Sequence, residues 1–338
     1  MINFADVVVG LAWGDESKGK ISAQLASKKN DDGSSYYSCV ARWAGGNNAG
    51  HTVWVKGEKY KTHLIPSGVF YGVKSIIGPD CVLHPDSFME EIGYLDDNGF
   101  DSSLVKVSPK CHIVTNKHIQ YDKENLSESL GTTSKGIAPC YADKSARVGI
   151  LAKNVLDDKY IWDESLEGNI LCEGAQGFWL DINMGTYPFV TSSTTLPYGA
   201  CSIGFPAQKI RDVWGAAKIY DTRSGEDPLF PKSLFENKAL SKLGELGEEY
   251  GVTTGRRRKV NWLDLDRLIY SINVSGTTKL VISKCDVIEE LSIFRCFYKG
   301  AIVRFFNIES MKEFIKNEVE KRCSMVREIV YSSSPKEI

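Results

Sequence analysis

The sequence of 338 residues contains nine cysteines but no C-x-x-C pair. An odd number of scattered thiols argues against a disulfide framework or a zinc site, and it predicts reduced, mostly buried cysteines. Residues 1–15 include no basic run and carry acidic side chains at Asp6 and Asp15, so we expect neither a signal peptide nor a membrane span there. These absences together predict a cytoplasmic protein.

An excess of charge is also absent, because 41 basic residues face 43 acidic ones and the net charge is −2. No overall field would hold a nucleic acid or an anionic membrane, so we expect neither as a partner. There is no internal repeat, and no stretch is rich enough in Pro, Gly or Ser to act as a linker. The length allows one or two domains, and we favour a single domain over residues 1–338.

Short apolar runs bounded by Gly, Asp or Pro lie at residues 7–9, 75–77, 169–172 and 279–282. This pattern is typical of parallel strands buried on both faces. Helical periods lie between them, at 21–25 and again at 311–319, where apolar residues recur along one face. The alternation predicts an α/β fold with a central, mostly parallel sheet flanked by helices, and ligands at the carboxyl ends of its strands.

The first predicted strand runs into G-x-x-x-x-G-K, from Gly14 to Lys20. Glycines between a strand and a helix allow backbone N–H groups to approach phosphate oxygens. Ile21 stands where an ordinary phosphate loop has the Ser or Thr that binds Mg²⁺, and the loop instead carries an acidic pair, which can bind Mg²⁺ or accept a proton. The alternative is a plain glycine-rich turn. The candidate phosphate-binding residues are Gly14, Glu16, Ser17, Lys18, Gly19 and Lys20.

A second candidate motif, S-K-C-D, directly follows the predicted strand at 279–282. The carboxylate of Asp286 can accept hydrogen bonds from N1–H and the 2-amino group of guanine, while the aliphatic stem of Lys284 covers the ring. Asp286 could instead cap a helix. Together with the phosphate loop, the motif predicts GTP as the bound nucleotide.

Eight ordered segments, which include WGDESKGK, RWAGGNNAGHT, EGAQG and TTGRRR, give the chain a wider resemblance. They lie at residues 13–20, 42–52, 63–68, 131–150, 173–193, 218–231, 251–264 and 283–286. They resemble the adenylosuccinate synthetase family across nearly the whole chain, and the length resembles its compact archaeal and viral forms. The resemblance implies the P-loop-like GTP-binding fold of that family. It also implies a GTP- and Mg²⁺-dependent ligase that joins L-aspartate to C6 of a 6-oxopurine nucleotide through a 6-phosphoryl intermediate.

The resemblance further implies residue roles. Asp15 matches the base that removes the N1 proton, and it matches a Mg²⁺ ligand together with the Gly50 carbonyl. His51 matches the residue that stabilises the transferred phosphoryl group, and Gln176 matches a catalytic residue that reads the purine edge. The implied nucleotide contacts are Asn48, Thr132, Thr133, Thr191, Gln176, Ser224 and Arg256, with Arg147 supplied by the neighbouring subunit of a homodimer. The implied aspartate contacts are Thr253, Thr254, Arg256 and Arg258, because guanidinium groups pair well with carboxylates.

Each of these residues also has a simpler interpretation, since a lone His is often packed, a Thr often caps a turn and an RRRK run is often a solvated face. A GTP-dependent switch protein would share the phosphate loop and S-K-C-D, but it would have no use for the arginine clamp or for His51.

Several positions depart from the family pattern. Ser17 replaces the usual Gly, and its hydroxyl could bind a 2-amino group that IMP lacks and guanine carries. Ala12, Ser224 and the segment 332–335 also differ from the family. A viral branch acts on dGMP and makes 2-amino-2′-deoxyadenylosuccinate, and some of its members lose the acidic pair that this chain keeps. We favour dGMP as the substrate, with IMP as the alternative. If the chain is viral, we expect the protein in the host cytoplasm.

Overall fold

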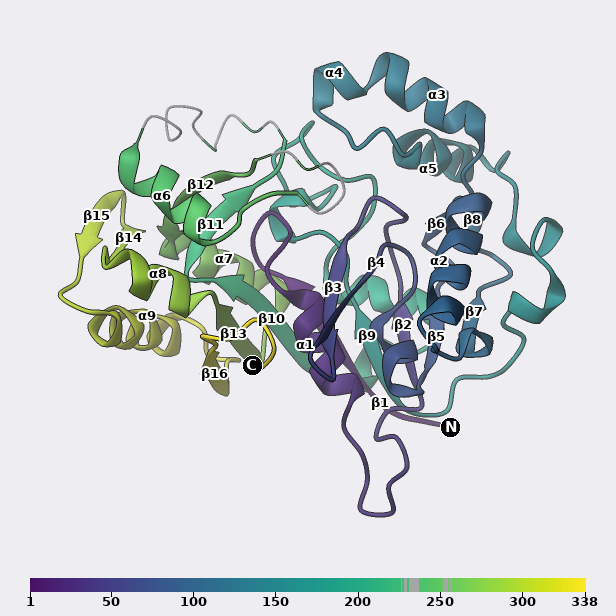
Figure 1. The fold of residues 1–338 in the computed structure, drawn as a ribbon, viewed down its shortest axis with the longest axis horizontal. Helices are drawn as coiled ribbons and strands as arrows, with labels where there is room; N and C mark the ends of the chain where they lie inside the picture. The colour runs from purple at the N-terminus through teal and green to yellow at the C-terminus, as the bar shows by residue number, and fades with distance from the viewer. Residues whose placement is uncertain (226, 228–229, 231–236, 252–254, 256) are drawn as a thin grey trace.

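The computed structural model describes the whole chain except residues 226, 228–229, 231–236, 252–254 and 256. Its centre is a sheet of eight strands in which all neighbouring strands are parallel (Figure 1). In spatial order the strands are β16 (Glu328–Tyr331), β13 (Lys279–Ser283), β10 (Ile210–Lys218), β1 (Ile2–Gly10), β9 (Gly168–Glu173), β2 (Cys39–Arg42), β5 (Lys74–Ile77) and β7 (Val105–Val107). The predicted parallel sheet is confirmed, and the four predicted runs lie in β1, β5, β9 and β13.

Within the described residues, three smaller sheets accompany the central one. A four-stranded sheet has the order β11 (Tyr220–Arg223), β12 (Lys259–Asp264), β14 (Arg295–Tyr298) and β15 (Ala301–Arg304). A hairpin joins β3 (His51–Val55) to β4 (Glu58–Thr62), and β6 (Val82–Leu83) pairs with β8 (His112–Ile113).

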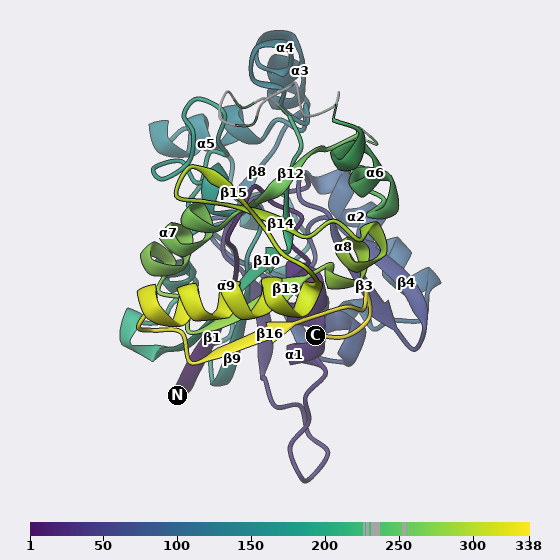
Figure 2. The same ribbon diagram turned by 90° about the vertical axis from the view of Figure 1, so that its left-hand side faces the viewer.

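The helices include one that follows the first strand directly, as predicted. They are α1 (Lys18–Ala26), α2 (Pro85–Asp97), α3 (Asn116–Asn125), α4 (Ser127–Leu130), α5 (Ile137–Ala146), α6 (Lys238–Leu246), α7 (Leu265–Ser275), α8 (Cys285–Leu291) and α9 (Ile308–Arg322). Figure 2 shows α9 along the face of the sheet near β16. Its buried residues follow the predicted apolar stripe, and the chain before it forms a capping box at Asn307. No helix within the described residues has the length and apolar character needed to cross a membrane.

The core lies on both faces of the sheet. Val7 and Val9 pack in one hydrophobic cluster with residues of α7, α8 and α9, whereas Val8 packs in another with residues of α1. Alternate residues of a strand face opposite sides, so a strand covered on both faces needs a continuous apolar run. All nine cysteines are free and eight are buried, as expected.

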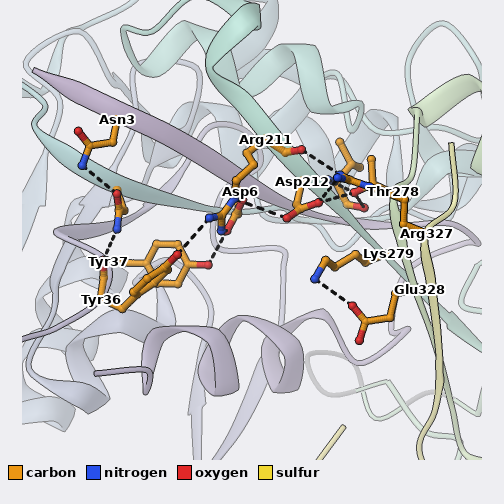
Figure 3. A network of polar contacts seen from close by, with 12 residues as sticks. Asn3, Asp6, Tyr36, Tyr37, Arg211, Asp212, Thr278, Lys279, Arg327 and Glu328 are labelled. Carbon is orange, nitrogen blue, oxygen red and sulfur yellow. Dashed lines mark hydrogen bonds and ion pairs between the residues drawn. The ribbon is translucent and has the colours of Figure 1, made fainter. Parts of the chain in front are cut away.

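A polar network joins four strands of the central sheet, at the first residues of β10, β13 and β16 and at the middle of β1 (Figure 3). Buried Asp6 of β1 accepts hydrogen bonds from the Tyr37 hydroxyl at 2.6 Å and from Arg211 Nε of β10 at 3.0 Å. The neighbouring Asp212 pairs with Arg327 at 2.6 Å, and Lys279 of β13 pairs with Glu328 of β16 at 2.9 Å. Among the described residues, no predicted site residue belongs to this network. The loop after β1 and the ends of β9 and β10 lie at the carboxyl ends of the strands.

Candidate active site

The loop between β1 and α1 closes around one of its own carboxylates. Glu16 is only 1% exposed, and its Oε1 accepts the N–H groups of Ala12 at 3.1 Å and Gly14 at 2.7 Å. Its Oε2 pairs with Lys18 Nζ at 2.5 Å. Gly14 and Ser17 adopt left-handed backbone angles, with φ of 92° and 71°. Glu16 therefore holds the shape of the loop, and Asp15, whose side chain is 32% exposed, is the member of the acidic pair that can meet a ligand.

Asp15 leads into a buried chain of charges. Its Oδ2 lies 2.9 Å from Arg258 Nη2, and Arg258 Nη1 donates to Glu249 at 2.6 Å. Glu249 also accepts bonds at 2.9 Å on both oxygens from Lys218 Nζ, at the end of β10, and one at 2.7 Å from the Tyr220 hydroxyl. Burial alone would raise the pKa of Glu249, but the charges of Lys218 and Arg258 bring it to about 2. Glu249 thus fixes the guanidinium that contacts the predicted base.

His51 opens β3, and it is paired with an acid that sequence analysis did not assign. Its Nδ1 contacts Oε1 of Glu173, the last residue of β9, and both side chains are buried. The other oxygen of Glu173 accepts the backbone N–H of Ser67 at 3.0 Å and its hydroxyl at 2.5 Å. Burial lowers the pKa of His51, and the charge of Glu173 partly opposes this shift. Because Nδ1 faces Glu173, the ring presents Nε2 to a ligand.

The pKa of Glu173 itself lies at about 2, although burial alone would raise it. The charges of His51 and Arg42 and the hydrogen bond from Ser67 outweigh that burial. Glu173 is therefore a carboxylate at neutral pH, and it can hold a proton on the facing nitrogen of the imidazole.

Gly19 brings His51 close to the phosphate loop. A Cβ atom on Gly19 would lie 3.2 Å from the Thr52 carbonyl oxygen and 3.3 Å from the His51 Cβ, closer than most real contacts of that kind. The absence of a side chain therefore allows the first turn of α1 to pack against β3.

Asn48 and Gln176, predicted to contact the substrate nucleotide, lie side by side. Gln176 Nε2 is 3.4 Å from Asn48 Oδ1, which also accepts the Gly46 N–H at 3.1 Å. The buried Oε1 of Gln176 has no partner among the described residues, and the residue has a φ of 58°. A buried amide oxygen without a donor is unfavourable unless a ligand supplies one.

The predicted threonines differ in what they bind. Thr132 Oγ1 donates to buried Asp122 at 2.7 Å and accepts the Ser134 N–H at 3.3 Å, so it caps a turn. The hydroxyls of Thr133 and Thr191 make no hydrogen bond with the part of the chain that the structure describes, and they can meet a ligand.

The remaining predicted nucleotide and aspartate contacts are less enclosed. Arg147 follows α5 with a φ of 65° and is exposed, and Ser224 is exposed just after β11. Thr253, Thr254 and Arg256 lie outside the described residues.

The predicted guanine motif follows β13. Lys284 precedes α8 with a φ of 67°, and its Nζ donates to the Gly247 carbonyl at 2.9 Å. Asp286 is exposed in the first turn of α8, so the alternative that it caps the helix is wrong. Lys20 Nζ donates to Ser332 Oγ at 2.7 Å, and the Ser332 carbonyl accepts the Cys285 N–H at 3.2 Å. The phosphate-loop helix and the guanine motif therefore meet at one place.

Aromatic side chains pack against Trp13 of the loop between β1 and α1. Trp13 stacks on Trp179 with ring centroids 6.0 Å apart, and Trp179 stacks on Tyr270 at 5.8 Å. The Trp13 indole N–H donates to Asp227 at 3.0 Å, and the Arg267 guanidinium lies about 5.5 Å from both indole rings. A cavity of about 540 Å³ is lined by Trp179, Arg267 and Tyr270 among others, and none of the predicted site residues that the structure describes lines it.

A parallel sheet with a glycine-rich loop and paired catalytic-type groups at its carboxyl edge defines a nucleotide-binding α/β enzyme. The family model described as adenylosuccinate synthetase matches residues 7–169 and 151–299. An adenylosuccinate synthetase from Heliobacterium modesticaldum is 38% identical over 374 residues, which cover 92% of this chain and 85% of that protein. The chain therefore belongs to the adenylosuccinate synthetase family and is a GTP-dependent ligase that forms a C–N bond.

Two solved structures resemble the fold. The fully ligated adenylosuccinate synthetase from Plasmodium falciparum is 27% identical, with a TM-score of 0.81 and 98% of each chain covered. The succinoaminodeoxyadenylate synthetase PurZ of cyanophage S-2L, bound to dGMP and dATP as an energy donor, is 17% identical. It has a TM-score of 0.73 and covers 99% of this chain and 94% of that one. At that identity the second likeness shows the fold alone.

Proposed function

We propose that the protein condenses IMP with L-aspartate at the expense of GTP, giving adenylosuccinate, GDP and phosphate. The observation that carries this proposal is the contact of Asp15 with Arg258, which sets a carboxylate able to take a proton beside a guanidinium able to bind a substrate carboxylate. A switch protein would need neither group. The identity of more than a third with bacterial adenylosuccinate synthetases supports IMP.

In the first step Asp15 accepts the N1 proton of the purine, and O6 attacks the γ-phosphorus of GTP. The O6–P bond forms as the bond to the GDP oxygen breaks. His51, whose Nδ1 is held by Glu173, directs Nε2 at the transferred group. Gln176 and Asn48 hold the purine and its phosphate, together with Thr133 and Thr191. The phosphates of GTP lie on the loop, and its base lies at Lys284 and Asp286.

In the second step the amine of aspartate attacks C6. The new C–N bond forms as the C6–O bond breaks, phosphate leaves, and a proton of the amine ends on the phosphate. Arg258 binds a carboxylate of aspartate, together with Thr253, Thr254 and Arg256. Glu249 keeps the Arg258 guanidinium in place through its 2.6 Å bond. Because Arg258 also contacts Asp15, the amino acid is delivered next to the base.

Mg²⁺ fits this site as an ion held mainly by substrate. No three ligand-type side chains gather into a metal cage within the described residues, but Mg²⁺ at nucleotide sites commonly needs only one or two protein ligands besides phosphates. The oxygen of Asp15 that does not face Arg258, and the Gly50 carbonyl beside His51, would hold it. A bound Mg²⁺ would neutralise charge on the phosphates during transfer.

We further propose one domain and a homodimer. Both β1 and β16 belong to one sheet, which favours a single folding unit. Arg147 is exposed at the end of α5 and would reach the nucleotide phosphate of the partner subunit. The variant Arg147→Leu should be inactive, and mixing it with inactive Asp15→Ala should restore part of the activity. No restoration in verified mixed dimers would place Arg147 in its own subunit's site, or outside any site.

One observation favours dGMP as a second candidate. Ser17 keeps a φ of 71°, a conformation that favours Gly, and its hydroxyl makes no hydrogen bond with the described residues. That hydroxyl is free to accept a bond from a purine 2-amino group. If it does so, Ser17→Gly should lower turnover of dGMP and leave turnover of IMP unchanged or higher.

The deciding experiment offers IMP and dGMP in parallel to the purified protein with GTP, Mg²⁺ and aspartate. Phosphate release and product mass are measured. We expect release that requires both aspartate and IMP, and release only with dGMP would overturn the choice of IMP. Release that needs neither purine nor aspartate would overturn the ligase assignment. Asp15→Ala should abolish ligation while leaving GTP binding measurable, because the backbone of the loop remains.

A further inference from the structure

The two lysines of the phosphate loop have different surroundings. Lys18 Nζ lies within the loop, paired with Glu16 at 2.5 Å, and its charge is felt by buried His51. Lys20 Nζ instead donates to Ser332 Oγ at 2.7 Å and to the Ser334 carbonyl at 2.9 Å. Its ammonium therefore points at the segment 332–338, which follows β16, and not at the backbone that would hold phosphates.

That segment is bound on its other side to the guanine motif. Ser332 donates its N–H to the Ile282 carbonyl at 2.9 Å and accepts the Cys285 N–H at 3.2 Å, so it lies against the chain between β13 and α8. Ser332 Oγ also donates to the Glu337 carbonyl at 2.7 Å. Cys285 stands between Lys284 and Asp286, the residues expected to bind the base.

Further contacts join the segment to α1. The Ile338 N–H donates to Gln24 Oε1 at 2.9 Å. A cavity of about 330 Å³ separates the remaining parts, with Lys20 and Gln24 on one wall and Pro335 to Glu337 on another. Lys20 is thus the buried group that connects the start of α1 to the segment beside the guanine motif.

We infer that Lys20 is a positioning residue for recognition of the donor's base, and that Lys18 is the lysine that meets its phosphates. This inference rests on the proposed GTP site and assigns its two lysines to opposite ends of the nucleotide. A buried ammonium is unfavourable unless it keeps its hydrogen-bond acceptors. The bonds from Lys20 to Ser332 and Ser334 therefore hold the segment 332–334 in place. Lys20 then links the first turn of α1 to the segment beside the guanine motif without contacting the phosphates.

The test compares Lys20→Met, which keeps the length of the stem and loses the donors, with Lys20→Arg and with Lys18→Met. One measurement is the ratio of kcat/KM for GTP to that for ITP, which lacks the 2-amino group. The other is competitive inhibition by inorganic tripolyphosphate, which has no base. Lys20→Met should lower the GTP-to-ITP ratio by about tenfold or more, as expected for lost hydrogen bonds of a charged group, and leave tripolyphosphate inhibition unchanged.

Lys18→Met should do the converse, and Lys20→Arg should restore much of the ratio. Weaker tripolyphosphate inhibition in Lys20→Met with an unchanged ratio would overturn the inference, because Lys20 would then be a phosphate ligand. If Lys20→Met does not fold, Ser332→Ala removes the hydroxyl acceptor from the other side and should lower the same ratio. Should the wild-type protein show no ligation, the proposed function fails, and the affinities of GDP and IDP still decide the role of Lys20.

Discussion

Replacing Glu173 with Gln tests whether Glu173 orients and charges His51 for phosphoryl transfer. The buried carboxylate uses one oxygen for His51 Nδ1 and the other for the N–H and hydroxyl of Ser67. An amide of the same shape has only one acceptor oxygen. If that oxygen serves His51, the Ser67 backbone N–H loses its acceptor, and if it serves Ser67, an NH₂ group faces the imidazole.

Two magnitudes follow. A buried donor without an acceptor should lower the free energy of unfolding by about 1–3 kcal/mol. A mispositioned acid–base group should lower kcat by roughly 10²–10⁴-fold. The change also removes the negative charge that opposes the burial-lowered pKa of His51, so that pKa should fall further. If turnover needs a protonated ring, the fall of kcat at high pH should move to lower pH in the variant.

The assay is aspartate-dependent phosphate release from pH 5 to 9, with unfolding in denaturant measured alongside. The matched control is Glu91→Gln in α2, because Glu91 is another buried carboxylate that accepts backbone N–H groups, among them that of His63 at 2.6 Å. This control should lose stability and keep the pH profile. A Glu173→Gln enzyme with a wild-type kcat and an unmoved pH profile would refute a role of Glu173 in catalysis.

Three further results are expected. Glu249→Gln removes the negative charge that holds Arg258 and Lys218, so the KM for aspartate should rise about tenfold. Initial-rate measurements should show an unchanged KM for IMP. An unchanged KM for aspartate would contradict the binding of aspartate by Arg258. Asp286→Asn exchanges an acceptor for a donor, so the preferred donor nucleotide should change from GTP to XTP, and equal losses with both would remove Asp286 from the base site. The pKa of Glu249, about 2, lies below the ordinary 4.5, so its contribution to the free energy of unfolding is present above about pH 4.5 and is lost as the pH falls toward 2. Denaturant unfolding of Glu249→Gln should therefore show a smaller loss of stability over this pH range.

The sheet could be predicted where strands are continuous apolar runs, as in β1, since burial on both faces leaves no polar alternation. Strand β10 could not be predicted in this way, although it lies beside β1. Its sequence IRDVWGAAK is rich in small residues. A Cβ on Gly215 would lie 2.6 Å from Leu11 Cδ1, so the strand needs small residues for close packing, and propensity gives no sign of it.

The site shows a similar division. Asp15, His51 and Gln176 stand in motifs whose glycines and spacing are visible in the sequence. Glu173 and Glu249 are visible only as acids within matched segments or beside them. Their roles depend on His51, 122 residues away from Glu173, and on Lys218, 31 residues away from Glu249. Contacts between residues so far apart in the sequence depend on the fold, so no local sequence pattern predicts them. Glu16, predicted to contact GTP, accepts the N–H groups of Ala12 and Gly14 in its own loop, a structural role that the motif does not reveal.

The network of Asp6, Arg211 and Arg327 has a consequence for how the sequence of this enzyme can change. Asp6 lies at the middle of β1 and Gly10 at its carboxyl end, about 13 Å apart at the usual rise of a strand. Substitutions at such separation generally act independently on stability. Residues such as Ser17 and Ser224 can therefore vary over generations while Asp6, Arg211 and Arg327 keep the sheet intact. Substitutions in the loops at the carboxyl ends of the strands therefore need not weaken the contacts that join β1, β10 and the residue before β16.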